Sequence, residues 1–419
     1  MKIEILSWSS YQGGAARAAN RLFSALKKYQ KSSINVNMRV NNTDFDMQDI
    51  ISPETKFGIG WNLIRRYAGL KFQSLQKTSN LCLHSSGLLP CSLDKKINNS
   101  KADLINLHWI QGEMLSIKSI SRINKPLIFT LHDSWAFSGS EHYPNGYNDR
   151  RYIEGYLKKN LPISHKGLDI DRLSWNMKIK YWKKKYQIVS PSNWLAECAR
   201  QSKLMREWPI DVIPNPVPLN TFKPFSKKLA KKVFNLDPKK KYILFCALKG
   251  SEDLRKGWDL LLPALKRLSE LRKNLEVIVL GENEPLNIPK IGMKINYLGQ
   301  FNDDQTLALV YSTADLVVVP SRMENLPQTA TEAQSCGTPV LAFNCSGFPD
   351  VISHKETGYL AEPFNVKSLL NGMLWILKNV EENKNLSKKS RSRACLLWNP
   401  SEISYKYKTL YEKVIQNCN

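Results

Sequence analysis

Short apolar runs alternate with amphipathic stretches along most of the chain. In the first half, the apolar runs that predict β-strands cover residues 2–6, 34–40, 103–107, 127–131, 186–190 and 210–213. The same alternation restarts later, with expected strands at 242–247, 275–280, 295–298, 315–319 and 339–343. Strands that alternate with helical stretches predict βαβ units and parallel sheets. The chain is therefore expected to have an α/β fold.

A proline-rich break separates the two series of strands. Residues 213–224 hold four prolines in twelve positions, which excludes the interior of a helix. We expect a first domain at 1–217 and a second at 218–397, with a C-terminal helix at about 398–419 that packs back on the first domain. Open α/β sheets bind ligands beyond the carboxyl ends of their strands. Two such doubly wound domains that face each other would place a site in the cleft between them.

Composition narrows the class of protein. The chain has 419 residues, of which 42% are hydrophobic and 23% are charged, as in a globular protein with two or three domains. These values exclude collagenous, coiled-coil and wholly disordered chains. There are 61 basic residues against 37 acidic ones, a formal charge of +24. This excess indicates a polyanionic partner, which is a nucleic acid, an anionic membrane or a phosphorylated substrate.

The cysteines and the hydropathy pattern favour a cytoplasmic protein. None of the eight cysteines forms a CxxC pair, so a compact zinc module is not expected and scattered free thiols are. The N-terminal segment becomes polar after six residues, unlike a signal peptide. No apolar run reaches the roughly 18 residues of a membrane-spanning helix.

The most informative segment is 315–343, DLVVVPSRMENLPQTATEAQSCGTPVLAF. An expected strand is followed by a loop with Glu324, and Glu332 follows eight residues later in an expected helix. The backbone N–H groups from Asn325 through Leu326 to Gln328 lie at the start of that helix, which suits a phosphate group. Carboxylates accept hydrogen bonds from sugar and ribose hydroxyls. Both glutamates can therefore face one nucleotide-containing ligand.

This E-x(7)-E segment resembles the signature of glycosyltransferase family 4, retaining and metal-independent enzymes of the GT-B fold. The resemblance spans most of the chain. Segments at 13–22, 129–139, 188–200, 212–224 and 347–361 each resemble their counterparts in order. The nearest subgroup builds bacterial surface polysaccharides. The implied architecture is two Rossmann-like domains, the first for the acceptor and the second for the donor.

The resemblance implies donor-binding roles for several residues. Glu324 would contact the hydroxyls of the donor sugar, and Glu332 the ribose of the nucleotide. The glycine-rich turn Gly13-Gly14 would let the backbone approach the donor phosphate. Two cations would hold the diphosphate. The sequence LRKG supplies Arg255 and Lys256, and Lys249 is a further candidate for the second cation.

The resemblance also implies residues near the reacting centre and the acceptor. His132 ends an expected strand and would lie beside the reacting face of the donor sugar, with a structural histidine bonded to Asp133 as the alternative. His108 occupies an equivalent strand end, where structural and acceptor-binding roles are equally open. Arg17, Asp133 and Trp135 are the other expected acceptor-binding residues. No cofactor and no divalent metal are expected.

The chain departs from this family in two places. The nearest subgroup often has several cysteines after the HDxW stretch, whereas this chain has none there, so a local metal site built on them is not expected. The acidic residue usual in the NPxD-type hinge is replaced by Pro218.

Competing interpretations rest on weaker motifs. Metal-dependent GT-A enzymes use DxD after a strand, and DxD occurs at 44–46 and 169–171 without a clear preceding strand. The turn GGAARAA does not match the GxGxxG of dinucleotide oxidoreductases. A basic nucleic-acid- or membrane-binding protein without transferase activity is the main rival, because residues 150–185 hold eleven basic residues among aromatic ones.

A membrane partner is expected in addition to the substrates. Residues 56–77 carry five basic and no acidic residues among aromatic and aliphatic ones. Together with 150–185, this stretch suits an anionic bilayer, with Arg65, Arg66 and Lys71 among the contacting cations. The expected partners are a nucleotide sugar (UDP- or GDP-linked), a lipid-linked glycan acceptor and the cytoplasmic face of the inner membrane. No nucleic-acid partner is expected.

Overall fold

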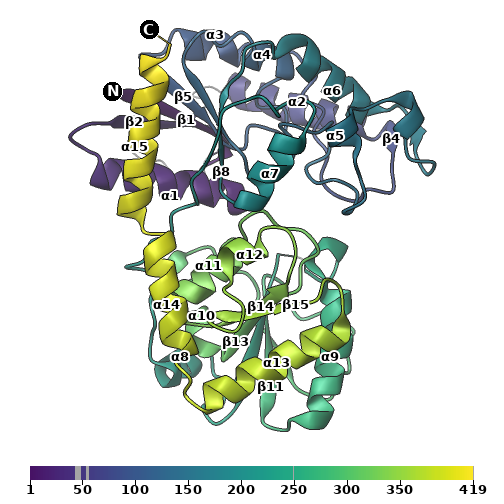
Figure 1. The fold of residues 1–419 in the computed structure, drawn as a ribbon, viewed down its shortest axis with the longest axis vertical. Coiled ribbons are helices and arrows are strands. Elements are labelled where there is room, and N and C mark those ends of the chain that lie inside the picture. The colour runs from purple at the N-terminus through teal and green to yellow at the C-terminus, as the bar shows by residue number, and fades with distance from the viewer. Residues whose placement is uncertain (43–48, 53–55, 249, 419) are drawn as a thin grey trace. The chain divides into compact units, whose positions relative to one another are not determined.

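The computed structural model describes residues 1–42, 49–52, 56–248 and 250–418. The chain divides into two compact units (Figure 1). The first contains Met1–Pro216 together with the C-terminal segment Pro400–Asn419, and the second contains Val217–Asn399.

The first unit is built on a parallel sheet of seven strands among its described residues. Their order across the sheet is β3-β2-β1-β5-β6-β8-β9. The strands are β1 (Lys2–Ser9), β2 (Asn35–Asn42), β3 (Ile50–Ile51), β5 (Leu104–Leu107), β6 (Leu127–Thr130), β8 (Gln187–Ser190) and β9 (Ile210–Val212). A separate antiparallel pair joins β4 (Gln76–Lys77) to β7 (Lys166–Gly167). Strands β5, β6 and β8 are buried along their whole length, which explains their continuous apolar runs.

Helices of the first unit pack on its sheet and extend from it. They are α1 (Gly14–Tyr29), α2 (Lys56–Gln73), α3 (Leu93–Asn98), α4 (Ile117–Ile120), α5 (Arg151–Glu154), α6 (Ile170–Tyr181), α7 (Asn193–Gln201) and α15 (Pro400–Gln416), with a 3₁₀ turn η1 (Lys158–Asn160). The C-terminal helix α15 lies beside α1 (Figure 1). Its Tyr411 hydroxyl accepts a hydrogen bond of 2.8 Å from the Asn106 amide in β5. This buried bond fixes the end of the chain to the centre of the first sheet.

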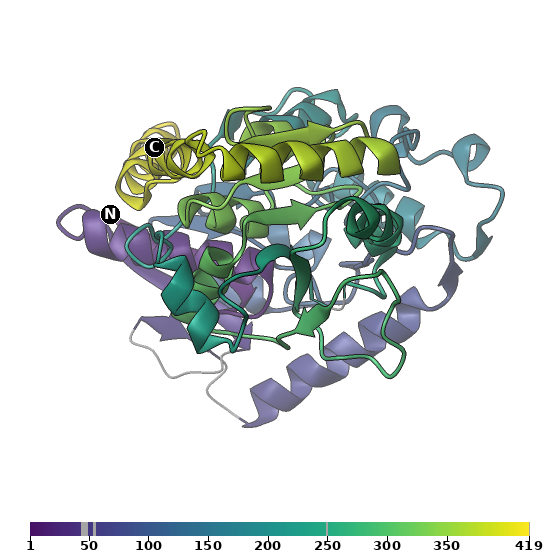
Figure 2. The ribbon, with the colours of Figure 1, turned by 90° about the horizontal axis from the view of Figure 1, so that it is seen from below.

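The second unit is also built on a parallel sheet, of six described strands. Their order is β12-β11-β10-β13-β14-β15. The strands are β10 (Lys241–Cys246), β11 (Leu275–Leu280), β12 (Ile295–Tyr297), β13 (Leu316–Val319), β14 (Val340–Phe343) and β15 (Gly358–Ala361). The helices are α8 (Lys227–Val233), α9 (Trp258–Leu271), α10 (Asp304–Thr313), α11 (Gln328–Ser335), α12 (Phe348–Val351), α13 (Val366–Glu381) and α14 (Leu386–Leu397), with a 3₁₀ turn η2 (Leu254–Lys256). Helix α13 runs along β14 and β15 (Figure 2). Two parallel α/β sheets confirm the predicted fold class.

Neighbouring strands bring the chemistry-bearing loops to one edge of each sheet. In the first unit, β1 pairs with β5 and β5 with β6, all parallel. In the second, β10 lies between β11 and β13. The segments that follow these strands leave the sheet at its carboxyl edge, where open α/β sheets bind their ligands.

The aromatic residues of 150–185 do not form the expected basic-aromatic surface. Tyr156, Trp175 and Trp182 are buried, and Trp182 packs edge-on against Trp135 with 6.1 Å between ring centroids. The expectation that these three rings lie on a nucleic-acid- or membrane-binding face is therefore wrong, because they belong to the core of the first unit, whereas Tyr152 and Tyr181 are half-buried. No helix among the described residues is long and apolar enough to cross a membrane.

Candidate active site

A tight turn in the second unit presents two cations at the carboxyl edge of the sheet. The Asp253 carboxylate accepts a bond of 2.9 Å from the Arg255 backbone N–H and so caps η2. Gly257 ends the turn at a φ of 74°. A Cβ atom on Gly257 would lie 2.0 Å from the Pro320 carbonyl oxygen. Only glycine therefore allows the LRKG turn to rest against the end of β13.

Arg322 ties this turn to the loop that follows β13. Its backbone N–H donates to the Arg255 carbonyl oxygen at 2.7 Å. Its guanidinium forms a two-bond ion pair with Asp259 at 2.9 and 2.6 Å. Paired planar groups of this kind are geometrically specific as well as strong. The two loops are thus held in one arrangement before any ligand arrives.

Glu324 lies between the two cations of the turn. Its Oε1 accepts from Lys256 Nζ at 2.7 Å and from Arg255 at 3.0 Å. Burial works against the charged carboxylate, but Lys256 and then Arg255 outweigh it, and together they lower the pKa of Glu324 to about 2. Glu324 is therefore ionised at neutral pH. A carboxylate and two cations at one strand end suit a ligand that carries both hydroxyls and phosphates.

A second loop fixes the backbone of Glu324. Ser346 Oγ accepts from the Glu324 N–H at 3.1 Å, and the Gly347 N–H donates to the Glu324 carbonyl at 2.9 Å. A Cβ atom on Gly347 would lie only 1.4 Å from the Asn325 carbonyl oxygen. The loop after β14 therefore requires glycine here in order to support the loop after β13.

Glu332 lies in α11 and is buried. Its Oε2 accepts a hydrogen bond of 2.8 Å from the Tyr311 hydroxyl. Asn325 and Leu326, which precede α11, are also buried. The Tyr311 contact gives Glu332 a fixed orientation from within the unit.

The first unit places a glycine-rich turn after β1. Gly13 takes a φ of 90°, which favours glycine, and precedes α1, whose first residue is Gly14. Ser9 Oγ accepts from the N–H groups of Tyr11 and Gln12 at 3.2 and 3.0 Å. Arg17, one turn into α1, lies over the Tyr11 ring at 5.2 Å. The turn is thus held by its own side chains.

Two histidines meet at the ends of β5 and β6. The Nδ1 of His108 lies 2.9 Å from the Nε2 of His132, so one ring donates its proton to the other. Burial lowers the pKa of His132 to about 4 and that of His108 well below its usual value. Both rings are therefore neutral near pH 7, and each is a weak base that can serve as a hydrogen-bonding group in its neutral form.

Asp133 organises the residues around this pair. Its Oδ2 accepts from Trp109 Nε1 at 3.1 Å and lies 2.6 Å from His142 Nδ1, while Oδ1 accepts from the Trp135 N–H at 3.0 Å. Burial would raise the pKa of Asp133, but His142 outweighs it and the net change is a decrease. Asp133 is thus an ionised anchor for two rings, Trp109 and His142.

The comparisons with known proteins agree on one family. The family described as Glycosyl transferases group 1 matches residues 226–393. A D-inositol 3-phosphate glycosyltransferase from Mycobacterium sp. (strain KMS) is 33% identical over 321 residues, which are 73% of this chain and 66% of that protein. The chain belongs to the group 1 glycosyltransferases. It spans between 36% and 66% of the length of the first curated relatives that it matches.

Solved structures show the same fold for this glycosyltransferase. Sucrose-phosphate synthase from Thermosynechococcus elongatus covers 99% of both chains with a TM-score of 0.70 and 18% identity. Anabaena HepE, solved in complex with UDP-glucose, covers 98% of this chain and all of its own, with a TM-score of 0.64 and 16% identity. The GT-B fold and the glycosyltransferase class expected from the sequence are confirmed. The alternative interpretation, a basic nucleic-acid- or membrane-binding protein without transferase activity, is set aside.

The structure brings together some of the predicted donor-binding residues of this glycosyltransferase. Glu324, Arg255 and Lys256 are in direct contact, whereas Glu332 is oriented by Tyr311. Lys249 lies outside the described residues, as does the DxD segment at 44–46. The roles of the described residues toward a donor remain predictions.

Two predicted acceptor-binding residues are corrected. Trp135 is fully buried, and its Nε1 donates to the Ser85 carbonyl at 2.7 Å, so it belongs to the core of the first unit. Asp133 is used by Trp109, His142 and its own loop, which makes it a positioning residue. Arg65, expected on a membrane-facing surface, is also buried.

The sequence reasoning missed the residues that support the site. Trp109 follows His108 directly, and Ser346 and Gly347 follow the strand β14. The segment that begins at Gly347 had been noted only for its resemblance to other glycosyltransferases. The positive φ of 46° at Ser346 cannot be deduced from the amino-acid sequence. The sequence did offer one signal for these residues, because aromatic or small residues follow shortly after a parallel strand in both segments.

Proposed function

We propose that this chain is a retaining, metal-independent glycosyltransferase that moves a sugar from a UDP- or GDP-sugar to a lipid-linked acceptor of bacterial surface polysaccharide. The observation that carries the proposal is the contact of Glu324 with Lys256 and Arg255 at the carboxyl edge of the second sheet. One side chain suited to sugar hydroxyls and two suited to a diphosphate occupy the same strand end.

In this proposal the second unit binds the donor. Lys256 and Arg255 bind the diphosphate, while Glu324 turns to the sugar hydroxyls and Glu332 to the ribose. Negative charge grows on the departing diphosphate as the glycosidic bond breaks. Fixed cations and the N–H groups at the start of α11 stabilise that charge without reorganisation. The departing phosphate accepts the proton of the acceptor hydroxyl on the same face, so configuration is retained without a protein nucleophile.

In the same proposal the first unit binds the acceptor. The neutral His132 hydrogen-bonds near the reacting face of the donor sugar, and His108 fixes its orientation at 2.9 Å. Gly13 and Gly14 let the backbone approach the donor, and Arg17 contributes charge at the start of α1. Loss of His108 would act through His132, which makes His108 a positioning residue.

We infer further that α2 docks on the cytoplasmic face of an anionic membrane. Ile59, Leu63, Tyr67 and Leu70 recur at helical spacing and are exposed, between 49% and 63% each. Helix α2 has no acidic residue in its sequence KFGIGWNLIRRYAGLKFQ. An exposed apolar stripe beside basic residues suits an interface where rings and aliphatic chains enter the headgroup layer.

Calorimetry in the presence of a chelator tests the donor part of the proposal. UDP and GDP, and then a panel of their sugars, are titrated into the full chain in EDTA. One nucleotide is expected to bind without divalent metal. Binding that appears only after magnesium or manganese is added would overturn the metal-independent mechanism. D-inositol 3-phosphate, the acceptor in the relatives' name, is compared with lipid-linked acceptors in the transfer assay, and its selective use would overturn the surface-polysaccharide assignment.

Liposome sedimentation tests the membrane part. Each Lys or Arg near an anionic surface contributes about 1 kcal/mol, screened over about 8 Å at physiological salt. Binding is expected to need anionic lipid and to weaken as salt rises. Leu63→Glu in α2 is expected to weaken it, whereas Leu229→Glu in α8, similarly exposed at 57% against 61%, is not. Equal effects of both variants would refute docking through α2.

A further inference from the structure

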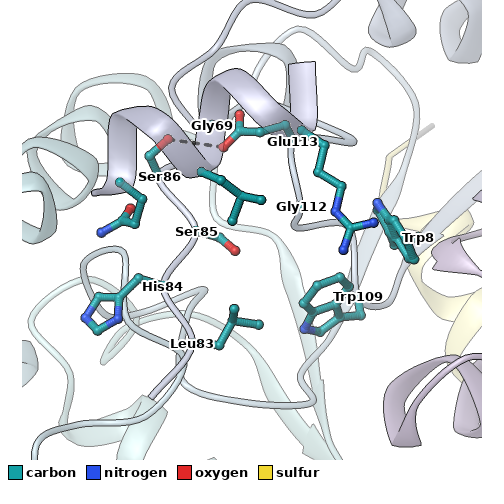
Figure 3. A pocket seen from close by; sticks show the side chains of 12 residues that line it. Trp8, Gly69, Leu83, His84, Ser85, Ser86, Trp109, Gly112 and Glu113 are labelled. Carbon is teal, nitrogen blue, oxygen red and sulfur yellow. Dashed lines mark hydrogen bonds between the residues drawn. The ribbon is translucent and has the colours of Figure 1, made fainter. Parts of the chain in front are cut away.

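The first unit contains a pocket walled by two tryptophans. It has a volume of about 140 Å³ and lies within one unit (Figure 3). Its lining comes from the end of β1, from α2, from the segment 83–86 and from the segment after β5. Such a volume is below the roughly 300–1,000 Å³ of pockets for drug-sized ligands, so it suits one ring rather than a long chain.

The tryptophans are held in place before a ligand binds. Trp8 and Trp109 pack edge to face, with centroids 6.4 Å apart and an interplanar angle of 89°. Trp109 donates to Asp133 at 3.1 Å, and the ring of His142 stacks against it at 5.5 Å. Arg66 lies over the Trp8 ring at 4.8 Å. Rigid aromatic faces of this kind bind at low entropic cost.

A buried carboxylate completes the wall opposite Trp109. Glu113 is 5% exposed, and its Oε1 accepts from Ser86 Oγ at 3.1 Å, as the dashed line in Figure 3 marks. Its Oε2 has no hydrogen-bond partner among the described residues. Burial raises the pKa of Glu113, and Ser86, Arg65 and the backbone N–H groups of Gly87 and Leu89 oppose that change. A buried carboxylate is costly unless donors surround it, and a ligand hydroxyl in the pocket would add one.

Helix α2 is shaped to fit over this carboxylate. A Cβ atom on Gly69 would lie 2.5 Å from Glu113 Cγ, so glycine is required for that close approach. Glu113 itself has a φ of 64°, which is uncommon for a residue with a side chain. Glu113 is therefore enclosed between α2 and the segment after β5.

We propose that this pocket binds one neutral pyranose ring of the acceptor, stacked on Trp109 with a hydroxyl that donates to Glu113. The proposal rests on the transferase function above and specifies its acceptor. A sugar ring offers apolar C–H faces to the indole and hydroxyl donors to the carboxylate. An acyl chain would leave the carboxylate without a partner in an apolar contact, and a phosphate would be repelled by it.

Trp109 links the lining of the pocket to the residues of the proposed reacting centre. The same side chain that walls the pocket donates to Asp133, which directly follows His132 in sequence. His132 in turn contacts His108, the residue that precedes Trp109. Trp109 is thus adjacent in sequence to His108 and hydrogen-bonded to the residue that follows His132.

The test uses the full chain labelled with fluorotryptophan and observed by fluorine NMR. The Trp109 and Trp8 signals are assigned from Trp109→Phe and Trp8→Phe. Methyl glycosides of glucose, galactose, mannose and N-acetylglucosamine are titrated to millimolar concentrations. At least one is expected to shift the Trp109 signal with saturation. Glu113→Gln is expected to weaken its affinity about ten-fold or more, as for a lost hydrogen bond to a charged group.

Controls separate this inference from the proposed function. Trp61→Phe in α2, away from the pocket lining, is expected to leave glycoside affinity unchanged. Unchanged signals from the other fluorotryptophans of the first unit confirm that each variant is folded. Should Glu113→Gln fail to fold, Trp109→Phe decides the matter, with the Trp8 signal as the readout because this variant lacks the Trp109 signal. Nucleotide binding without any shift of Trp109 would overturn the pocket and leave the transferase proposal standing. A shift by octanol that is equal in wild type and Glu113→Gln would overturn it in favour of an acyl chain. Glycoside binding without nucleotide binding would support the pocket and count against the transfer reaction.

Discussion

Replacement of Glu324 by glutamine separates the sugar-binding role of this carboxylate from the diphosphate-binding role of its two partners. Its pKa falls from 4.5 to about 2, which corresponds to about 3 kcal/mol in favour of the carboxylate at about 1.4 kcal/mol per tenfold change in proton affinity. That energy comes from Lys256 at 2.7 Å and Arg255 at 3.0 Å. A diphosphate that binds the same cations must compete with Glu324 for them.

Glu324→Gln is therefore expected to leave UDP or GDP affinity unchanged or to increase it, by about 100-fold at most. Transfer is expected to fall by roughly ten- to 150-fold, as for one charged hydrogen bond to the sugar. Calorimetry measures the first quantity and a transfer assay with saturating donor measures the second. The reasoning is refuted if the variant binds the nucleotide ten-fold more weakly than wild type.

A matched control exists in the same unit. Glu381 in α13 also contacts two cations, Lys241 at 3.0 Å and Arg272 at 3.2 Å. Lys241 is the first residue of β10, so this cluster lies at the amino end of the strand, away from the LRKG turn. Glu381→Gln removes a carboxylate from two cations without touching the candidate site. It is expected to change neither nucleotide affinity nor transfer.

Three further predictions follow from the same structure. Lys256→Gln is expected to weaken UDP or GDP binding in EDTA by about ten-fold or more, as calorimetry would measure, and undiminished binding would remove Lys256 from the diphosphate site. Burial lowers the pKa values of His132 and His108, so the unfolded chain binds protons at a higher pH than the folded chain does. The stability of the first unit should therefore fall as the pH is lowered from 6.5 to about 4, by up to about 3 kcal/mol for His132. Urea unfolding followed by tryptophan fluorescence would measure this loss, and a flat profile over that range would contradict the buried neutral pair. Gly257→Ala places a Cβ atom 2.0 Å from a carbonyl at the end of β13 and is expected to lower both the melting temperature and nucleotide affinity, whereas Gly60→Ala, with nothing within 4 Å, should do neither.

The alternation of apolar runs was sufficient to predict the sheets. The strand predicted at 275–280 has the observed bounds. The one predicted at 242–247 is shifted by one residue from 241–246, and the one predicted at 339–343 begins one residue early. Fully buried parallel strands give continuous apolar runs, which periodicity detects. Helices α13 and α14 and strand β15 were not predicted, because the sequence between 344 and 397 was considered only for its resemblance to other proteins.

The residues proposed to act on the donor could be predicted from sequence motifs, whereas the residues that hold them in position could not. Glu324 and Lys256 were named from separate segments, and their contact depends on the φ of Gly257 and on Arg322, which no pattern in the sequence connects. Trp135, in contrast, was predicted to bind the acceptor and is a residue of the core. It follows a strand and lies beside Asp133, but its indole N–H bonds to Ser85, fifty positions earlier in the chain. Whether a tryptophan ring faces a ligand or the core therefore depends on hydrogen-bond partners that are distant in the sequence.

The helices α2 and α6 both combine basic, aromatic and aliphatic residues, but the apolar residues of α2 include an exposed stripe whereas α6 buries an aromatic ring. The reason is the spacing of their apolar positions. In α2, Gly69 and the buried Arg65 occupy the inward face, so Leu63 and Tyr67 must point outward. In α6, Trp175 and Lys178 share the inward face, and the Lys178 ammonium group donates to the carbonyls of Ser138 and Gly139 at 3.0 and 2.7 Å. Burial of that lysine lowers its pKa to about 7. A basic residue therefore does not by itself mark a solvent-facing or membrane-facing surface. The exposed apolar stripe of α2, where the proposed membrane contact lies, separates it from α6, whose Trp175 and Lys178 are buried.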